Sequence, residues 1–580
     1  MLVSTRFGNT PQLHYLSMPM GARKQITFFD EPVSGATFEP VSGNYFIFSR
    51  DAGGNEFGQL YRYDMKSGNI TLLTDGGRSQ NGNIRWNNSR TKISYTSTKR
   101  NGTDRDVYVM NPLDPATTSM VCEVKGGGWA VTDWAPDDRK LILQESLSVN
   151  EANLYVYDME TKTRKPVGPV SKKEQVVNSG GRFSKDGKYI FFVTDADNEY
   201  RRLARMNADG TDLKIITPGL KWDIGSTDMN EEGTKILFTV SEAGITRVYL
   251  LDVATLKYEE LPGMPTGIIG GISWRPGSNE FAFSYNSARV NADVYSYNCD
   301  NGKTERWTES ELGGIVSNQL SEAELIKWKG HDELEISGFY FKPNKKFEGK
   351  RPVIIMIHGG PEGQSLPVFQ SRNNYFMEEL GVAIIYPNVR GSTGYGKTFV
   401  KLDNGYMREH SVKDIGALID WIATRPDLDA SRIMVMGGSY GGYMSLAVSV
   451  HYADKIRCAV DVVGISNFNT FLKNTESYRR DLRRVEYGDE RDPKMMAFLE
   501  DISPLTNAAR IKKPLLIVQG GNDPRVPRTE AEQMYNTLVS QGNTVWYLEA
   551  SDEGHGFRKK NNVDFQFYVT IEFMKKFLIP

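Results

Sequence analysis

The chain has little of what a disulfide-stabilised, metal-binding or membrane-spanning protein needs. Its 580 residues hold three cysteines, none with Cys–Cys or Cys–His metal-site spacing: Cys122, Cys299 and Cys458. Such an odd and sparse set indicates neither a disulfide framework nor a zinc site. No apolar run approaches the ~18 residues of a membrane span. The first residues also lack the basic, apolar and small segments of a signal peptide.

The balance of charge argues against further classes of partner. The 70 basic and 72 acidic side chains leave a net charge of −2, which does not favour binding to nucleic acid or to a membrane surface. No motif indicates a metal or an organic cofactor. The chain as it stands fits the cytoplasm, whereas a periplasmic or secreted location would need a signal peptide upstream of Met1. Assembly into a homo-oligomer is left open.

The most informative stretch is Met436–Gly442, which contains a Gly-x-Ser-x-Gly core. It lies between an apolar strand-like run over 432–437 and a helix-like run over 443–453. A serine on a sharp strand-to-helix turn exposes its Oγ, and the flanking glycines let the backbone cross close to itself. A glycine-rich turn without function is the alternative. The strand and helix context predicts that Ser439 is a nucleophile.

A nucleophilic serine needs a base and an acid that orients the base. Asp523 follows the strand-like run Leu515–Gly520, and His555 lies between two glycines after the strand-like run 544–549. In α/β-hydrolases the three residues follow the chain order Ser, Asp, His. Asp523 alone would be read as a turn residue. With all three in order on strand ends, we predict a catalytic triad of Ser439, Asp523 and His555.

Donors for an oxyanion are also present. One is the backbone N–H of Tyr440, the residue after the predicted nucleophile. The second is a backbone N–H of Gly359 or Gly360, or the hydroxyl of Tyr395, in loops that follow two earlier strand-like runs. Tight-turn chemistry for the glycines and simple packing for Tyr395 are the alternatives.

Together these motifs resemble the prolyl oligopeptidase family of serine peptidases. The matching segments are His-Gly-Gly-Pro at 358–361, Asn-x-Arg-Gly-Ser-x-Gly-Tyr-Gly at 388–396, Gly-x-Ser-Tyr-Gly-Gly at 437–442, Asp-x-Arg-Val-Pro at 523–527 and Gly-His-Gly-Phe at 554–557. The resemblance covers the whole chain and is strongest to the acylaminoacyl-peptidase and dipeptidyl-peptidase branches. It implies hydrolysis of short peptides and a β-propeller that caps the active site and excludes large folded substrates.

A repeat before residue 313 tests this resemblance independently. An aromatic residue or Met before a turn and an apolar strand recurs at Phe38, Trp86, Trp134, Phe183, Met229 and Trp274. An aliphatic residue that opens an alternating strand recurs at Leu13, Leu60, Val107, Leu154, Leu203, Val248 and Val294. Both series have the spacing typical of propeller blades. They predict an all-β seven-bladed propeller whose first blade is incomplete.

The first blade carries a separate expectation. Residues 1–28 align with the second half of a blade, so the innermost strands of blade one are not encoded in this sequence. We expect either a native segment upstream of Met1 or a ragged first blade that weakens closure of the ring.

The blade periodicity stops near residues 308–322, where a polar run leads into new strand-like segments. We therefore predict a two-domain chain, with a β-propeller over 1–312 and an α/β-hydrolase domain over 313–580. The absence of a long linker or low-complexity stretch suggests that the two domains pack directly.

Fewer residues in the sequence indicate which substrate the site binds. By the resemblance, Ile465, Phe468 and Phe471 line the pocket for the residue before the scissile bond, together with the Tyr440 side chain. Arg525 and Val526 of the Asp-x-Arg-Val-Pro segment are further candidates for substrate binding. The alternative is that the apolar members of this set are ordinary core residues.

Four arginines could bind a substrate carboxylate: Arg479, Arg480, Arg483 and Arg484. Acidic residues close by favour instead a solvated, internally paired helix face. Aminodipeptidases of the family hold the free amine of the substrate with a propeller motif of the type Asp-Trp-x-x-Glu-Glu. This motif is not found here. Two Glu-Glu pairs, Glu231-Glu232 and Glu259-Glu260, do not match it in context. This favours an acylaminoacyl-peptidase-like or oligopeptidase activity over a dipeptidyl peptidase. A carboxylesterase and a non-catalytic propeller binding protein are the rival hypotheses.

Overall fold

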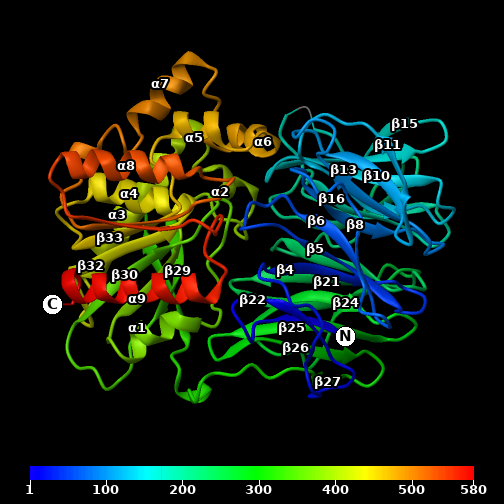
Figure 1. Ribbon diagram of the computed structural model, residues 1–580, viewed down its shortest axis with the longest axis horizontal. Coiled ribbons are helices and arrows are strands. Elements are labelled where there is room, and N and C mark those ends of the chain that lie inside the picture. Colours follow the sequence, from blue (N-terminus) through cyan, green and yellow to red (C-terminus); the bar gives the residue numbers. More distant parts are fainter. Residues whose placement is uncertain (172, 580) are drawn as a thin grey trace.

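The computed structural model describes residues 1–171 and 173–579. Figure 1 shows a ring of β-sheets, which begins at the N-terminus, beside a second region in which helices flank one large sheet. Within the described residues, no helix is both long and apolar enough to cross a membrane.

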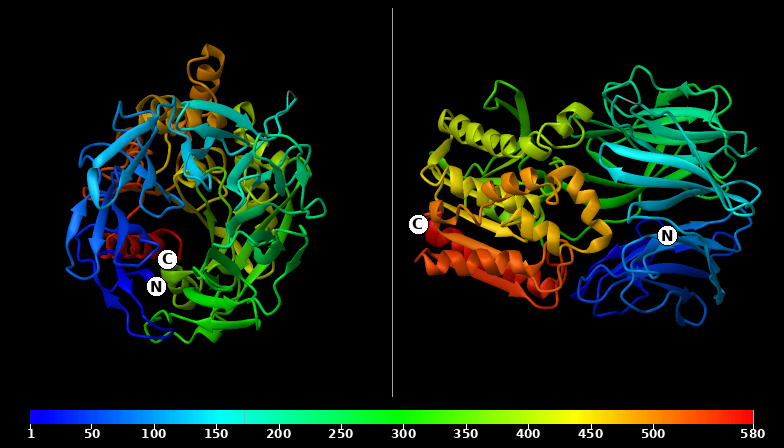
Figure 2. Two further views of the ribbon diagram at one scale, coloured as in Figure 1. Left: turned by 90° about the vertical axis from the view of Figure 1, so that its right-hand side faces the viewer. Right: turned by 90° about the horizontal axis from the view of Figure 1, so that it is seen from above.

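The ring is a β-propeller, seen face-on in the left view of Figure 2. Within the described residues, seven antiparallel sheets follow one another around it. Their strands are β1(Leu2–Thr5), β2(Gln12–Tyr15), β3(Lys24–Gln25); β4(Val33–Phe38), β5(Tyr45–Arg50), β6(Gln59–Asp64), β7(Ile70–Leu72); β8(Asn81–Trp86), β9(Ile93–Ser97), β10(Asp106–Asn111), β11(Asp114–Cys122); β12(Trp129–Trp134), β13(Lys140–Ser148), β14(Glu151–Asp158), β15(Thr163–Val167); β16(Asn178–Phe183), β17(Tyr189–Thr194), β18(Arg202–Asn207), β19(Lys214–Ile215); β20(Ile224–Met229), β21(Lys235–Glu242), β22(Ile245–Asp252), β23(Tyr258–Glu260); and β24(Ile268–Trp274), β25(Glu280–Ser287), β26(Val290–Asn298), β27(Lys303–Arg306).

The sequence repeat falls on equivalent positions of the blades. Each aromatic or Met marker, from Phe38 to Trp274, is the last residue of the first strand of a four-stranded blade. Each aliphatic marker lies in the third strand, and Leu13, its first member, is buried in β2. Apolar side chains at these positions pack between neighbouring sheets. The prediction of a seven-bladed propeller is confirmed.

The first blade differs in one respect from the expectation. Its sheet has three strands in the order β1-β2-β3, and β1 pairs antiparallel with β2 in the register Leu2↔Tyr15. In the other blades this place beside the third strand belongs to the second strand. We expected more than one inner strand of this blade to be missing. This expectation is wrong, because β1 occupies the place of the second strand.

The second region contains an eight-stranded sheet with the order β28-β29-β31-β30-β32-β33-β34-β35. β28 and β29 are antiparallel to their neighbours, and the pairs from β31 to β35 are parallel. The strands are β28(Ala323–Lys329), β29(Glu335–Phe341), β30(Arg351–Ile357), β31(Ala383–Asn388), β32(Leu428–Gly438), β33(Cys458–Val462), β34(Leu515–Gly520) and β35(Val545–Ala550).

Helices cover both faces of this sheet, as Figure 1 shows. They are α1(Asn374–Glu378), α2(Lys397–Lys401), α3(Glu409–Ala423), α4(Tyr440–His451), α5(Phe468–Asn474), α6(Ser477–Tyr487), α7(Pro493–Asp501), α8(Arg528–Ser540) and α9(Lys560–Phe577). Because successive strand residues point to opposite faces, Ile355 belongs to the hydrophobic core that includes α3, α4 and α8, whereas Ile354 belongs to the core that includes α1 and α9. Parallel strands buried on both faces explain the continuous apolar runs in the sequence.

The two regions touch at the carboxyl ends of the parallel strands. Thr103 of the propeller donates a hydrogen bond of 2.8 Å to Ser477 at the start of α6, and Thr398 donates one of 2.7 Å to Glu199. Gly54, in the turn between β5 and β6, lies against the backbone of Gly554, so that a Cβ on Gly54 would stand 2.5 Å from the Gly554 nitrogen. Loops of the propeller therefore pack directly on loops of the α/β region.

The contact at Gly54 gives a test of this junction. Gly54 has a φ of +73°, and Gly277, in an exposed turn, has a φ of +65° with nothing near its missing Cβ. Alanine is strained at both, but only Gly54→Ala also overlaps a backbone across the junction. We expect Gly54→Ala to unfold at a lower temperature than Gly277→Ala, by an overlap cost of about 1–3 kcal/mol. Equal midpoints in scanning calorimetry would show that the junction does not constrain this turn.

Candidate active site

Ser439 lies on a sharp turn between β32 and α4, with φ 60° and ψ −117°. A positive φ is rare for a non-glycine residue and is strained. An added Cβ on Gly441 would overlap the carbonyl of Ile357, and one on Gly437 would overlap Gly441. Both glycines are thus required because the turn packs against the end of β30. The strand–turn–helix context that the sequence predicted for Ser439 is present.

Asp523 and His555 lie in the loops after β34 and β35 and contact each other. His555 Nδ1 is 2.7 Å from Asp523 Oδ2, the distance of a hydrogen bond donated by a protonated Nδ1. The other oxygen, Oδ1, accepts the backbone N–H groups of Arg525 at 2.8 Å and Val526 at 3.0 Å. The Asp523 side chain is fully buried. These bonds fix the carboxylate and hold the imidazole with Nε2 free for another partner.

The predicted hydrogen bond between Ser439 and His555 is not formed in the described part of this structure. Among the hydrogen bonds of residues 1–171 and 173–579, none joins Ser439 Oγ to His555. All three residues nevertheless follow strands of one sheet. Ser439 follows β32, Asp523 follows β34 and His555 follows β35, and the order of these strands in the sheet is β32-β33-β34-β35. The structure therefore joins Asp523 to His555 by a hydrogen bond and places Ser439 at the same end of the sheet, where the parallel strands have their carboxyl ends.

The predicted oxyanion donors differ in their placement. The backbone N–H of Tyr440 lies at the start of α4, where helix amides have no partner within the helix. Gly359 passes directly beside the nucleophile, since a Cβ there would stand 3.3 Å from Ser439 Cβ. Gly360 contributes to the cavity that also contains Ser439. The backbone at 359–360 is therefore close to Ser439.

Tyr395 is bound elsewhere. Its hydroxyl accepts hydrogen bonds of 2.9 Å from Ser337 Oγ and from Asn388 Nδ2, and its ring packs against Phe399 at 5.1 Å. It does not line the Ser439 cavity within the described chain. These contacts tie Tyr395 to β29 and β31, which favours a structural role over the predicted contact with an oxyanion.

A cavity of about 250 Å³ opens beside Ser439. It is lined by Gly360, Glu362, Gly363, Ser439, Ile465, Phe471, Arg479, Arg483, Tyr487, Arg525 and Val526. Four of the five predicted substrate-binding residues are in this set. The fifth, Phe468, is fully buried between Tyr443 and Tyr487. Phe468 thus belongs to the core beneath the cavity, and its prediction as a wall is wrong.

The Tyr440 side chain also differs from the expectation that it lines an apolar slot. Its ring is fully buried, and its hydroxyl lies 2.9 Å from Asp403 Oδ2 and 2.7 Å from Ser411 Oγ. Asp403 in turn forms a buried ion pair with Arg408 at 2.8 Å. Burial raises the pKa of Asp403 to about 6. Tyr440 therefore presents only its backbone toward Ser439 and anchors its side chain in a charged core.

The arginines of α6 divide between two faces. Arg484 pairs with Asp481 at 2.8 Å and with Glu490, as the prediction of an internally paired face requires. Arg479 and Arg483 instead line the Ser439 cavity, so the prediction of a solvated face is wrong for both, but Arg483 does pair within the helix, with Glu486 at 2.7 Å. Positions 479, 483 and 487 are four residues apart and share one face of the helix. This spacing is visible in the sequence and could have indicated a common role.

The propeller also contributes a charge to this region. Glu56, in the turn before β6, lies 2.6 Å from Arg525 Nε and 3.9 Å from Arg479 Nη1. Within the cavity, Glu362 lies 3.5 Å from Arg483. Glu56 is therefore hydrogen-bonded to an arginine, whereas Glu362 only lies near one and its buried Oε1 has no partner among the described residues. The motif search on the sequence missed both Glu56 and Glu362 because neither lies in a recognisable pattern.

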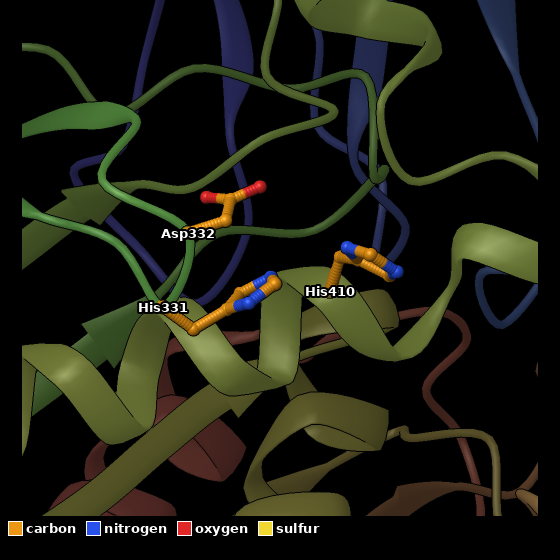
Figure 3. A group of neighbouring side chains, drawn as sticks. All are labelled: His331, Asp332 and His410. Atoms are coloured by element: carbon orange, nitrogen blue, oxygen red, sulfur yellow. The ribbon is translucent and has the colours of Figure 1, made fainter.

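One group of side chains has the composition of a metal site. The ligand atoms of His331, Asp332 and His410 lie within 4.8 Å of one another, and Figure 3 shows the three side chains. Both oxygens of Asp332, however, accept hydrogen bonds from Arg390, at 2.7 and 3.0 Å, which lowers the pKa of Asp332. A cation there would stand beside a guanidinium. The group is thus better described as an ion-paired surface cluster.

Comparisons with known proteins agree with this geometry. Residues 367–578 match the sequence model of the prolyl oligopeptidase family. Dipeptidyl aminopeptidase BIII of Pseudoxanthomonas mexicana is 25% identical over 536 residues, which cover 89% of this chain and 76% of that protein. The acylamino-acid-releasing enzyme of Sus scrofa is 27% identical over 222 residues, 37% of this chain and 30% of that protein.

The fold of the whole chain is also found in solved structures. A puromycin-hydrolyzing peptidase of Mycobacterium tuberculosis superposes with a TM-score of 0.85 at 18% identity, covering 99% of this chain and 92% of the other. At this identity the likeness concerns the fold. Together with the sequence matches, it confirms the family that the motifs resemble. Residues 367–578 thus match the prolyl oligopeptidase family, and the chain is a serine-type peptidase.

Proposed function

We propose that the chain hydrolyses short peptides with Ser439 as the nucleophile, His555 as the general base and Asp523 as the residue that orients His555. Ser439 Oγ attacks the peptide carbonyl, and His555 Nε2 takes its proton and passes it to the leaving amine. Water then repeats the cycle and releases the acyl group. The contact that supports this most directly is the 2.7 Å bond between His555 and Asp523 at the sheet edge that carries Ser439. We expect the Ser439–His555 bond to tighten on substrate binding, as catalytic hydrogen bonds often do.

The oxyanion is assigned to two backbone donors. The N–H of Tyr440 is one, and an N–H of Gly359 or Gly360 is the second, because this loop passes beside Ser439. The hydroxyl of Tyr395 is the weaker candidate, since it is held by Ser337 and Asn388. Loss of one such donor usually costs about a hundred- to a thousand-fold in rate.

The propeller is proposed to limit the size of the substrate. Its loops pack on the loops that carry the site: Gly54 lies against Gly554, next to His555, and Glu56 pairs with Arg525. The right view of Figure 2 shows the propeller at one end of the α/β region. A folded protein would have to displace these contacts to reach Ser439, whereas a short peptide would not.

Within this activity we favour an acylaminoacyl-peptidase-like or oligopeptidase mode over a dipeptidyl peptidase. A dipeptidyl peptidase must bind the free ammonium group of its substrate, which requires an available carboxylate. Near Ser439, Glu56 and Glu362 are already paired with Arg525 and Arg483. A substrate ammonium group would compete with Arg525 for Glu56, and with Arg483 for Glu362, whose Oε1 accepts no hydrogen bond among the described residues.

A carboxylesterase remains the rival function, because esters and amides are cleaved by the same catalytic groups. Comparing an ester and an amide with the same acyl group separates the two. A binding protein without activity is the other rival, and it would leave Ser439 unreactive toward a fluorophosphonate.

The first prediction concerns the nucleophile. Ser439→Ala should lower kcat for a peptide substrate by about a million-fold, as removal of the serine does in other triads. Ser540→Ala, which removes an exposed hydroxyl at the end of α8, serves as the control and should keep the wild-type rate. Fluorophosphonate labelling followed by mass spectrometry should modify Ser439 alone. A Ser439→Ala protein with a tenth of the wild-type rate would contradict the assignment.

The second prediction concerns the mode of cleavage. Wild-type protein and Ser439→Ala are incubated with a peptide library that carries free and acetylated amino termini, and the products are identified by mass spectrometry. We expect release of single acetylated residues or internal cuts by the wild type only, because the nearby carboxylates already face arginines. Dipeptides as the main product from peptides with a free amino terminus would show that an ammonium group is bound after all.

A further inference from the structure

Arg479 has no hydrogen-bonded partner at the wall of the Ser439 cavity. Within residues 1–171 and 173–579 its side chain makes no hydrogen bond, and its buried Nε has no partner. The nearest carboxylate, that of Glu56, is 3.9 Å from Nη1, beyond hydrogen-bonding distance. The side chain is only 17% exposed. A guanidinium has five N–H donors, so this one meets neither protein acceptors nor much water.

The neighbouring arginines, unlike Arg479, each make at least one side-chain hydrogen bond. Arg483 donates a 2.7 Å bond to Glu486 and also lies near Glu362. Arg525 pairs with Glu56 at 2.6 Å. Outside the cavity, Arg480 donates to the carbonyl of Thr475 at 2.9 Å. Of the three arginines that line the cavity, Arg479 is therefore the one whose side chain makes no hydrogen bond among the described residues, although Arg483 Nε is also buried without a partner.

The surroundings of Arg479 favour an anion. Burial first, and then repulsion by Arg483 and Arg525, lowers the pKa of Arg479 to about 10. A carboxylate placed against Arg479 would be attracted by all three guanidinium groups, against the repulsion of Glu362 in the same cavity, and would satisfy donors whose burial without partners is costly. A neutral acceptor would satisfy the same donors without the attraction between charges, and a cationic group would gain neither effect.

The position of Arg479 indicates which part of a substrate it meets. The same cavity contains Ser439 and the apolar side chains of Ile465, Phe471 and Val526. We assign a group that enters it to the acyl part of the peptide, which carries the carbonyl that Ser439 attacks. Resting on the proposed function, we propose that Arg479 is a specificity residue that binds the carboxylate of a Glu or Asp side chain in the acyl part of the substrate.

The test uses paired fluorogenic amides with the same leaving group, acetyl-Ala-Glu and acetyl-Ala-Gln, which differ in one charge. Wild type should show a kcat/KM about ten- to a hundred-fold higher for the Glu substrate, the range of a hydrogen bond to a charged group. Arg479→Met should reduce this ratio to about one while changing the Gln substrate little. Arg479→Lys, which keeps the charge but loses the fork, should give an intermediate ratio.

The control is Arg528→Met on α8, which removes the same charge from a half-exposed site paired with Glu532. It should keep the wild-type ratio. A wild-type preference for Gln, or an Arg479→Met ratio equal to that of wild type, would overturn the proposal. So would a preference for acidic residues that appears only after the scissile bond.

A binding measurement separates this proposal from the proposed function. Titration of Ser439→Ala with the acetyl-Ala-Glu and acetyl-Ala-Gln peptides in a calorimeter needs no catalysis. Tighter binding of the Glu peptide that disappears in Ser439→Ala/Arg479→Met supports the role of Arg479 even if wild type hydrolyses neither substrate and Ser439 is not labelled. Equal binding of the two peptides overturns it even if hydrolysis is observed.

Discussion

The active-site region depends on one buried ion pair, between Asp403 and Arg408. Both side chains are inaccessible to solvent and lie 2.8 Å apart. Arg408 also donates a 2.6 Å bond to the carbonyl of Glu486, near the end of α6, and Asp403 binds the hydroxyl of Tyr440. Removing one partner of such a pair typically costs about 3–5 kcal/mol because the other charge stays buried and unpaired. Thus one interaction fixes both the start of α4, beside Ser439, and the end of α6.

Through α6 the same constraint reaches the rest of the cavity. Tyr487, the last residue of α6, donates a 2.9 Å hydrogen bond to the carbonyl of Gly360, in the loop that passes beside Ser439. At its other end, α6 meets the propeller, where Ser477 binds Thr103 and Tyr478 packs edge-to-face with Phe57. The helix is therefore held between a buried ion pair and the propeller. The cavity arginines lie between these two anchors, so their positions depend on both.

Features fixed by neighbouring residues could be predicted from the sequence. The strand, turn and glycines around Ser439 form one continuous segment, and the propeller repeat is regular enough to locate each blade. Tyr395 was harder to place because one of its partners, Ser337, lies on β29, far away in the sequence. For Arg479 and Arg484 the sequence shows two helix faces, but not which one meets the cavity. That orientation is held by contacts with residues far away in the sequence, such as Arg408 with Glu486 and Thr103 with Ser477.

Glu56 shows why the propeller is more than a cover. Its carboxylate crosses the junction to pair with Arg525, and this leaves Arg479 without a hydrogen-bonded acceptor. If Glu56 instead bound Arg479, Arg525 would be the arginine left with free donors, at a different point of the cavity wall. A turn of the propeller thus determines where the available positive charge stands relative to Ser439. If both proposals hold, changes in that turn would alter which peptides fit by their charge as well as by their size.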